Sequence, residues 1–151
     1  MKRSIVTILV VVAVLFSSAL VVSASTPEDA KALALKALAF YKSNGKEKAI
    51  AAFNDPKGEF VKGDMYVVIQ AFDGIVVANG GNPKLVGMNH LELKDAGGNY
   101  FVKEQIEAAK KGGGWVTYQW VNPVTKKVGT KKAWIQRIEG TEMCINCGVF
   151  E

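Results

Sequence analysis

The sequence has few of the residues on which most metal and covalent sites depend: one histidine, two cysteines and four prolines in 151 residues. Two cysteines exclude a framework of several disulfides, and with one histidine they fall short of an ordinary four-ligand zinc site. A serine–histidine triad would have to use His90. No paired carboxylates or activated nucleophile stand out, so we predict a binding protein that is not an enzyme and has no metal or cofactor.

The excess of positive charge is small. The net charge is +5, and without the first 24 residues, which contain Lys2 and Arg3, 17 basic residues face 14 acidic ones, or +3. This balance argues against a nucleic-acid partner. Seven cations and no acid lie between Ala108 and Ile138. They are either solvated lysines that protect strand edges or a positive field that attracts small anions.

The first residues have the layout of a secretory signal. A positive start, Met1–Arg3, precedes the almost unbroken apolar run Ile5–Val22, and small residues follow at Ser23 and Ala24. We predict a signal peptide over 1–24 and one ligand-binding domain over 25–151. An uncleaved anchor is the alternative, because a run of 18 residues is near the lower limit for a membrane helix. Either interpretation places the domain outside the cytoplasm, in the periplasm or anchored on the outer face of the inner membrane.

Hydrophobic spacing changes along the rest of the chain. Thr26-Pro27 is typical of a helix start, and apolar residues then recur at helical spacing up to Asn44-Gly45. Shorter helices are expected over 46–53 and 99–111. β-Branched and aromatic residues flank Asp73-Gly74, which predicts a hairpin. The expected strands are 65–72, 75–78, 115–121, 131–138 and 143–150, so we predict an α+β fold with a five-stranded antiparallel sheet and a long N-terminal helix.

Several residue strings occur in a specific order through 27–151. They are Phe60–Tyr66, Asn82–Asn89, Asp95–Phe101, Gly114–Pro123, Lys131 with Trp134, and Gly148–Phe150. Together they resemble the single Cache domain in its type-two form, an extracellular relative of the PAS fold. The resemblance implies a PAS-like sheet and a sensor of small molecules, often short carboxylates. Asn79, Trp134 and Phe150 stand where the family commonly has histidine, tyrosine and tyrosine.

The resemblance also implies partners. Such domains usually form the outer part of chemoreceptors and histidine kinases, and their long N-terminal helices often pair. No second membrane helix or signalling domain follows Glu151 in this sequence. We therefore expect a small organic anion as ligand, a membrane histidine kinase or chemoreceptor as signalling partner, and a homodimer as the assembly.

Large aromatic residues are concentrated between Trp115 and Trp134. On a strand, Tyr118 and Trp120 point to one face and Trp115 to the other. The group either packs the core or lines a pocket formed by Tyr118, Trp120 and Trp134.

A carboxylate in such a pocket needs a charge-assisted donor to offset its desolvation. Lys131 matches the lysine position of the family and is our first candidate for the donor. Lys132 shares strand parity with Trp134, and Arg137, the one arginine after residue 24, offers a bidentate alternative.

Further polar contacts could come from Tyr66, Asn79 and Tyr100. The competing interpretations are turn chemistry for Asn79 and partial burial for the two tyrosines. His90 lies in an irregular segment, and we expect it at the surface or bonded locally.

The Cys144-Ile145-Asn146-Cys147 motif falls in a predicted strand. Positions three apart on a strand are about 10 Å apart, beyond the roughly 7 Å that a disulfide can bridge. Either the strand is distorted and the pair forms a local disulfide, or both are free thiols, or they serve an intermolecular bond or a cofactor. The alternative function is therefore a periplasmic thiol or redox protein that uses Cys144 and Cys147.

Overall fold

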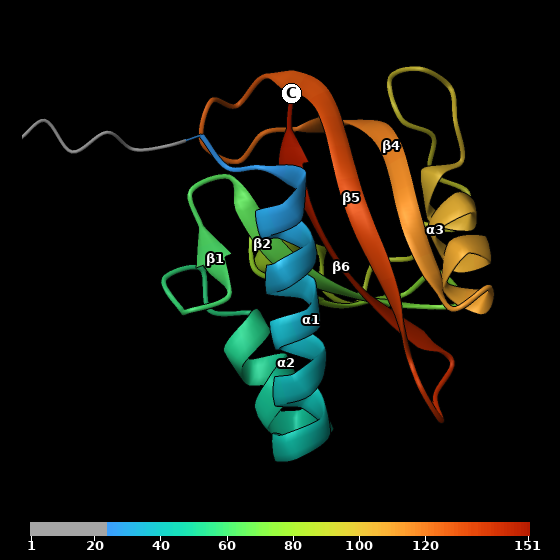
Figure 1. The fold of residues 1–151 in the computed structure, drawn as a ribbon. Helices are drawn as coiled ribbons and strands as arrows, with labels where there is room; N and C mark the ends of the chain where they lie inside the picture. The colour runs from blue at the N-terminus through green and yellow to red at the C-terminus, as the bar shows by residue number, and fades with distance from the viewer. Residues whose placement is uncertain (1–23) are drawn as a thin grey trace, which may run out of the picture.

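The computed structural model of the protein describes residues 24–151, so the predicted signal segment lies outside the described residues except for Ala24. Within this range, no helix combines the length and the apolar character that crossing a bilayer requires. The elements follow one another along the chain as drawn in Figure 1. They are α1 (Pro27–Asn44), α2 (Lys46–Phe53), β1 (Val61–Lys62), β2 (Met65–Ala71), β3 (Val76–Asn79), the 3₁₀ helix η1 (Pro83–Leu85), α3 (Phe101–Lys110), β4 (Gly113–Val121), β5 (Val128–Ile138) and β6 (Met143–Phe150).

The strands form one antiparallel sheet in the order β1-β2-β6-β5-β4, and β3 also pairs with β2. The predicted α+β class is confirmed. The strand count differs by one, because β1 has two residues and is too short to show an alternating pattern. β5 begins three residues earlier than predicted, since Val128 pairs with Val121 at the end of the β4–β5 hairpin.

Local signals place the first helix and the hairpin where the sequence predicts them. Thr26 and Asp29 form a reciprocal capping box at the start of α1: Thr26 Oγ1 accepts from the Asp29 N–H at 3.2 Å, and Asp29 Oδ2 accepts from the Thr26 N–H at 2.9 Å. Between β2 and β3, Asp73 Oδ1 accepts from the Ile75 N–H at 3.0 Å, and Gly74 adopts a φ of 91°. That φ favours glycine, because side chains with a Cβ rarely adopt it.

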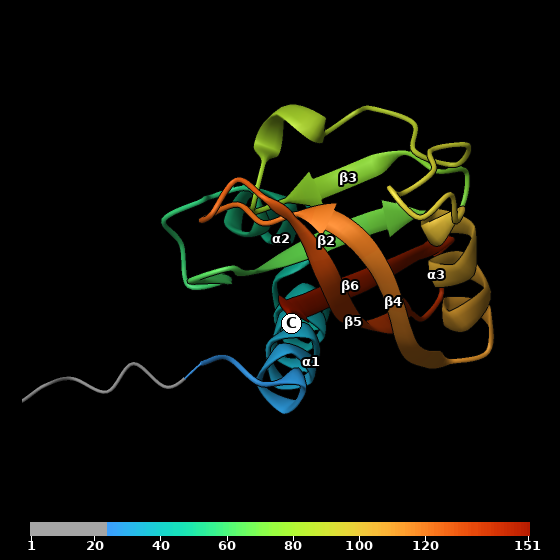
Figure 2. The same ribbon diagram turned by 90° about the horizontal axis from the view of Figure 1, so that it is seen from above.

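Helices cover both faces of the sheet. Figure 2 shows α1 and α2 on one side and α3 beside the strands on another. The alternation of β2 divides its residues between the two sides: Met65, Val67 and Ile69 pack with α1 and α2, whereas Tyr66 lines the opposite side. β6 alternates in the same way. Both central strands are therefore buried on two faces, and each face forms its own core cluster.

Candidate functional site

A small cavity lies on the α3 side of the sheet. Its volume is about 30 Å³. That is room for about two water molecules, since one needs roughly 10–15 Å³. The lining side chains come from β2, β3, β4, β6, α3 and the loop after β3: Tyr66, Val68, Gln70, Val76, Asn79, His90, Phe101, Gln105, Tyr118, Trp120 and Asn146.

The cavity is surrounded by an unusual number of buried polar side chains. Eight polar or charged residues are buried in the described part of the chain, and five of them line this cavity: Gln70, Asn79, His90, Gln105 and Asn146. Buried polar groups cost free energy unless they have hydrogen-bond partners. The α3 side of the sheet is therefore built to hold something polar, in contrast to the apolar layer under α1.

A buried lysine adjoins the same group. Lys131, on β5, has no exposed surface, and its Nζ lies 3.6 Å from the centroid of the Tyr66 ring, a cation–π contact. Its Nζ is 5.2 Å from the centroid of the Phe150 ring. No acceptor in the described residues meets hydrogen-bond geometry with this Nζ, although the Tyr66 hydroxyl is close enough to favour its charge. A buried cation without a carboxylate partner is a strong candidate for binding an anion.

The surroundings shift the pKa values of Lys131 and Tyr118, the two central groups of the site. Burial opposes the charged form of Lys131, but its interactions with Tyr66 and Tyr118 outweigh this, so the pKa of Lys131 lies above its usual value. Burial raises the pKa of Tyr118 to about 12, and Lys131 partly opposes that rise. Tyr118 is therefore a protonated phenol at neutral pH and can donate a hydrogen bond.

Aromatic stacking holds Tyr118 in place. The Phe101 ring stacks on Tyr118 with centroids 4.6 Å apart and planes at 11°, and Trp120 lies 5.2 Å from Phe101. Tyr118 and Trp120 point to the same side of β4, with centroids 6.4 Å apart, as strand alternation predicts. This packing also fits the core interpretation, so the aromatics serve both as core and as cavity wall.

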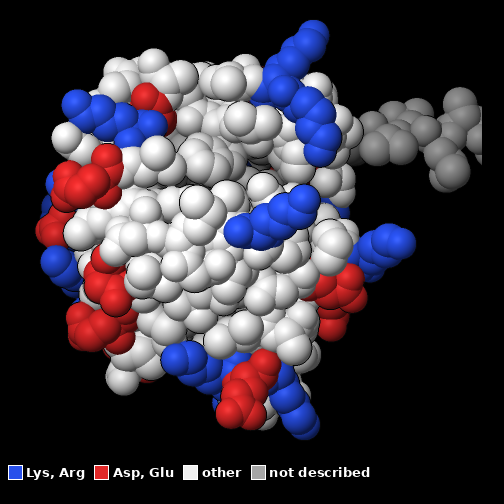
Figure 3. Space-filling model, turned by 180° about the vertical axis from the view of Figure 1, so that it is seen from behind, with Lys and Arg blue, Asp and Glu red and all other residues white. Residues whose placement is uncertain are grey.

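A larger surface pocket of about 470 Å³ adjoins the cavity. The two share Tyr66, Asn79 and Trp120, and Lys84 and Lys126 add positive charge to the outer one. Figure 3 shows the side opposite α1, where neutral side chains occupy most of the middle and acidic ones lie toward the edges. We call this outer pocket the vestibule. The three shared residues stand between the vestibule and the small polar cavity.

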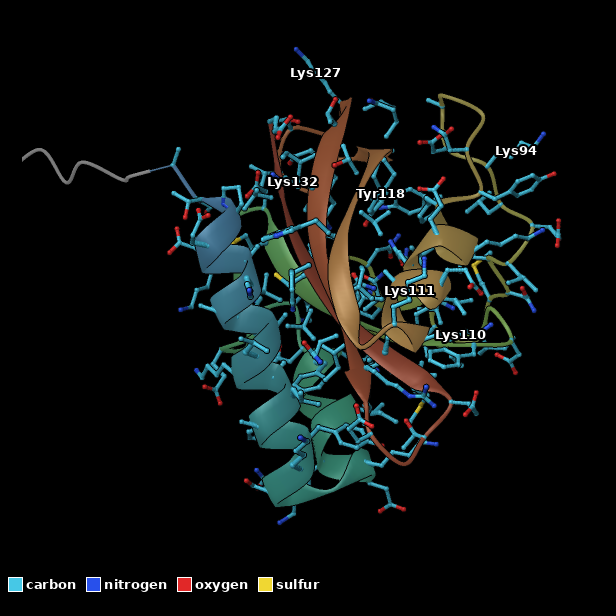
Figure 4. All side chains as sticks on the ribbon, turned by 45° about the vertical axis from the view of Figure 1, so that its right-hand side comes forward. Lys94, Lys110, Lys111, Tyr118, Lys127 and Lys132 are labelled. Atoms are coloured by element: carbon cyan, nitrogen blue, oxygen red, sulfur yellow. The ribbon has the colours of Figure 1, made fainter. Side chains whose placement is uncertain are left out.

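Two predicted site residues do not join this group. Trp134 lies on the α1 side, with its ring centroid 3.9 Å from Lys31 Nζ and 5.2 Å from the Trp115 ring. The reason is strand parity, because an even-numbered residue of β5 cannot face the same side as Lys131. Lys132 shares the α1 side, and Figure 4 shows it on the other side of the sheet from Tyr118.

Tyr100 and Arg137 also lie away from the cavity. Tyr100 is exposed, with the amines of Lys94 and Lys103 at 4.9 and 4.3 Å from its ring centroid. Arg137 forms an ion pair with Glu142 at 3.3 Å. Neither the tyrosine nor the alternative anion donor is placed to contact a molecule in the cavity.

Asn79 combines the two roles that the sequence left open. Its Oδ1 accepts from the N–H groups of Gly81 at 3.1 Å and Asn82 at 2.9 Å, which is turn chemistry. Its side chain also lines both the cavity and the vestibule. The turn thereby fixes a polar residue at the boundary between the two spaces.

Of the two positions that the sequence left open for His90, at the surface or bonded locally, the structure excludes the surface. His90 is only 7% exposed and lines the cavity. The backbone N–H of His90 donates to the Gly74 carbonyl at 2.8 Å, and the neighbouring Asn89 forms an isolated β-bridge with Ile75. These contacts hold the segment against the turn between β2 and β3. No periodicity in residues 79–98 could have shown that contact.

Sequence reasoning also missed Gln70, Gln105 and Asn146. Gln70 and Asn146 are polar residues inside otherwise apolar strands, and both are about 2% exposed. A polar residue where alternation requires burial is a detectable signal, because it needs a partner that the strand itself does not supply.

His90 is expected to make the protein less stable in mild acid. Desolvation lowers the pKa of His90, so near and below pH 6.5 the unfolded chain binds more protons than the folded one. The contribution of the neutral His90 to the free energy of unfolding is therefore fully present above pH 6.5. It is lost as the pH falls from 6.5 toward the pKa of His90 in the folded state. We expect urea midpoints to drop between pH 7.5 and 5.5, and His90→Gln, which removes the one histidine, to flatten this dependence. An equally steep dependence in the variant would contradict the assignment.

The two cysteines are not bonded to each other. Both are buried free thiols on a regular strand, which is the second of the three alternatives; the local disulfide in a distorted strand is not formed. Cys144 packs on the α3 side and Cys147 on the α1 side. Burial raises the pKa of Cys144 to about 12 and that of Cys147 to about 11. Protonated, buried thiols are poor nucleophiles, and this geometry gives the redox alternative no support.

A metal site is not evident either. Within residues 24–151, no group of three or more histidine, cysteine or acidic side chains is arranged to hold a metal ion. The polar cavity beside Lys131 is therefore the strongest candidate site in this part of the chain.

Comparison with known proteins supports the same fold. A family model described as Single Cache domain 2 matches residues 6–151. The structure is similar to that of a methyl-accepting chemotaxis protein from Vibrio parahaemolyticus RIMD 2210633, with a TM-score of 0.70, 18% identity and coverage of 82% of this chain and 86% of that one. No curated protein matches the sequence.

Two further solved structures share the fold. A periplasmic sensor domain of a chemotaxis protein has a TM-score of 0.63 at 18% identity, covering 82% of this chain and 88% of that one. A Cache chemosensory domain studied for carboxylic acid recognition has a TM-score of 0.63 at 20% identity, covering 82% and 86%. At these identities the likeness concerns the fold and not the ligand.

Proposed function

Because the chain belongs to the Single Cache domain 2 family, we propose that residues 25–151 form a sensor domain outside the cytoplasm. In this proposal the domain binds a small organic anion, a short carboxylate, and acts by binding rather than by catalysis. The leader over 1–24 takes the domain to the periplasm or anchors it on the outer face of the inner membrane.

The buried ammonium of Lys131 is the observation that carries the proposal. Its Nζ has no hydrogen-bond acceptor in the described residues, and Tyr66 and Tyr118 lie within range of its charge. A carboxylate could accept hydrogen bonds from Lys131 and from the protonated Tyr118. Charge-assisted bonds of this kind offset the desolvation of both ions. Asn79 and Trp120, two further predicted contacts, line the same cavity as Tyr66 and Tyr118.

The size of the cavity restricts the ligand and requires movement. A space of about 30 Å³ is smaller than any organic acid, so the ligand has to displace part of the wall. Tyr66, Asn79 and Trp120 stand between the cavity and the vestibule, and their displacement would join the two spaces. Binding coupled to such a change is common among regulatory proteins. We infer a ligand the size of acetate, propionate, lactate or pyruvate.

The partner of this domain in the proposal is a membrane chemoreceptor or histidine kinase, and α1 is the element through which two copies pair. α1 packs against β5 and β6 on the face opposite the cavity. A shift of these strands on ligand binding would therefore reach α1 through direct contacts.

A matched ligand screen tests the proposal. Short carboxylic acids and their uncharged amides are added to the purified domain, and the unfolding temperature is measured. A ligand at a hundredfold its dissociation constant stabilises a protein by about 2.7 kcal/mol, so a saturable shift is expected for at least one acid. The matching amide should give none. A domain that no acid stabilises, or that acids and amides stabilise alike, would show the proposal to be wrong.

A further inference from the structure

The hairpin between β4 and β5 carries exposed apolar side chains. We call residues 121–128 the β4–β5 tip. Val121, Val124 and Val128 are 47%, 63% and 57% exposed, and Val124 and Val128 are the two most exposed large hydrophobic residues in the described chain. Val121 and Val128 pair directly across the hairpin. Single exposed apolar residues are ordinary, whereas a cluster of them marks an interaction surface.

The turn that presents these valines is well fixed. Asn122 is buried, and its Oδ1 accepts from the N–H groups of Val124 at 2.8 Å and Thr125 at 3.1 Å. Its Nδ2 donates to Asp64 Oδ2 at 3.2 Å, which ties the turn to the loop before β2. The valines are therefore held outward by a bonded turn.

Positive charge accompanies the valines. Lys126 and Lys127 lie within the tip, in the stretch that contains no acidic residue from Ala108 to Ile138. Neither lysine forms an ion pair with another described residue. Figure 4 shows Lys127 pointing away from the molecule. Two acidic residues contact this hairpin: Asp64 accepts from Asn122, and the backbone N–H of Glu151 donates to the Thr130 carbonyl of β5 at 2.9 Å.

The tip lies at the end of the domain where the described chain begins. Ala24, Val124 and Phe150 line the same groove of about 300 Å³, and Figure 1 shows this loop beside the start of the coloured chain. The apolar run Ile5–Val22 ends two residues before Ala24. If Ile5–Val22 stays in the membrane as an anchor, the β4–β5 tip lies at the end of the domain that is joined to this anchor.

We propose that the β4–β5 tip is a membrane contact, in which the three valines enter the headgroup region of a bilayer and Lys126 and Lys127 bind anionic headgroups. Apolar side chains flanked by lysines are the combination that binds such an interface. Val121 and Lys126 of the tip also line the vestibule of the proposed carboxylate site. Vesicle binding is therefore measured without a carboxylate, so that the contact is tested separately from that site.

Sedimentation with lipid vesicles tests the contact. Residues 25–151 are suitable, since among the described residues every member of both core clusters lies between Ala30 and Val149. The probes are phosphatidylcholine vesicles with and without phosphatidylglycerol. We expect binding to the anionic vesicles, weakened by added salt and about fivefold weaker for each lysine removed in Lys126→Gln/Lys127→Gln. Val124→Asp should weaken binding by at least about tenfold.

Two matched controls distinguish the tip from the surface in general. Lys110→Gln/Lys111→Gln removes an equal charge at the other end of β4, which Figure 4 shows far from Lys127. Met88→Asp places an acid at another exposed apolar residue. Both controls should bind like the wild type. Absence of binding to anionic vesicles, equal binding to neutral ones, or equal losses in the tip variants and their controls would overturn the proposal.

Discussion

A chain that carries Lys131→Met is expected to lose its response to short carboxylates while folding at least as stably as the wild type. Methionine fills a similar volume and removes a buried ammonium that has no acceptor in the described residues. Replacing a buried charge by an apolar residue of similar volume is often neutral or stabilising. The carboxylate would instead lose its charge-assisted partner, which costs about 2–5 kcal/mol and weakens binding at least about thirtyfold.

The measurement is the carboxylate-dependent unfolding temperature of both proteins, with isothermal titration where the shift is large. Lys132→Met is the matched control, because Lys132 is the next residue of β5 but lies on the α1 side, 5.3 Å from the Trp115 ring centroid. The control should respond as the wild type does. A Lys131→Met protein that still responds, or a control that loses the response equally, would remove Lys131 from the site.

Replacing Phe53 by alanine is expected to cost about 3–5 kcal/mol of unfolding free energy. Phe53 is fully buried, and its ring centroid lies 4.6 Å from that of Phe60 and 6.0 Å from that of Phe40. α2 has eight residues, of which Ala49 and Phe53 are buried, so its docking depends on this ring. The whole free energy of unfolding of a domain is about 5–15 kcal/mol. The expected effect of Phe53→Ala is therefore a large share of the total.

Urea unfolding of the two proteins measures this difference. Leu35→Ala is the matched control. It also shortens an apolar side chain, but Leu35 lies on α1 and is 41% exposed. Exposed substitutions usually change stability by less than about 0.5 kcal/mol. Similar losses in both variants would mean that α2 does not dock through Phe53 as described.

The two faces of the sheet are the reason we expect Phe53→Ala and Lys131→Met to affect different properties, the first stability and the second binding. The layer under α1 and α2 is apolar and contains Phe53, whereas the α3 side holds the buried polar residues and Lys131. Apolar packing supplies most of the free energy of folding. Of the residues that line the cavity on the other face, the polar ones add less to that energy than Phe101 and Tyr118, which also belong to the core of that face.

Features that depend on neighbours in the sequence were predicted well. The helix start at Thr26-Pro27, the helix that follows it and the Asp73-Gly74 hairpin are all present. The opposed directions of Cys144 and Cys147 also follow from strand geometry. Each of these rests on contacts within a few residues, which local spacing and side-chain type specify directly.

The candidate site was predicted in part. Tyr66, Asn79, Tyr118 and Trp120 line one cavity, and Lys131 contacts the Tyr66 ring beside it. Their role in binding stays a prediction. For Lys131 the family resemblance outweighed strand parity with Trp134, and the structure places the two residues on opposite faces. The alternation of side chains along a strand shows which residues share a face of the sheet. It does not show which of the two faces packs against α1.

From its residue pattern alone, this chain specifies the order of its helices and strands, the separation of polar from apolar positions on each strand, and the fold class. The identity of the cavity wall depended on long-range folding: on the pairing of β5 with β6, which turns Lys131 away from α1, and on the loop that brings His90 over β2. Those contacts join residues far apart in the chain, and their geometry is set by packing, which no local period encodes.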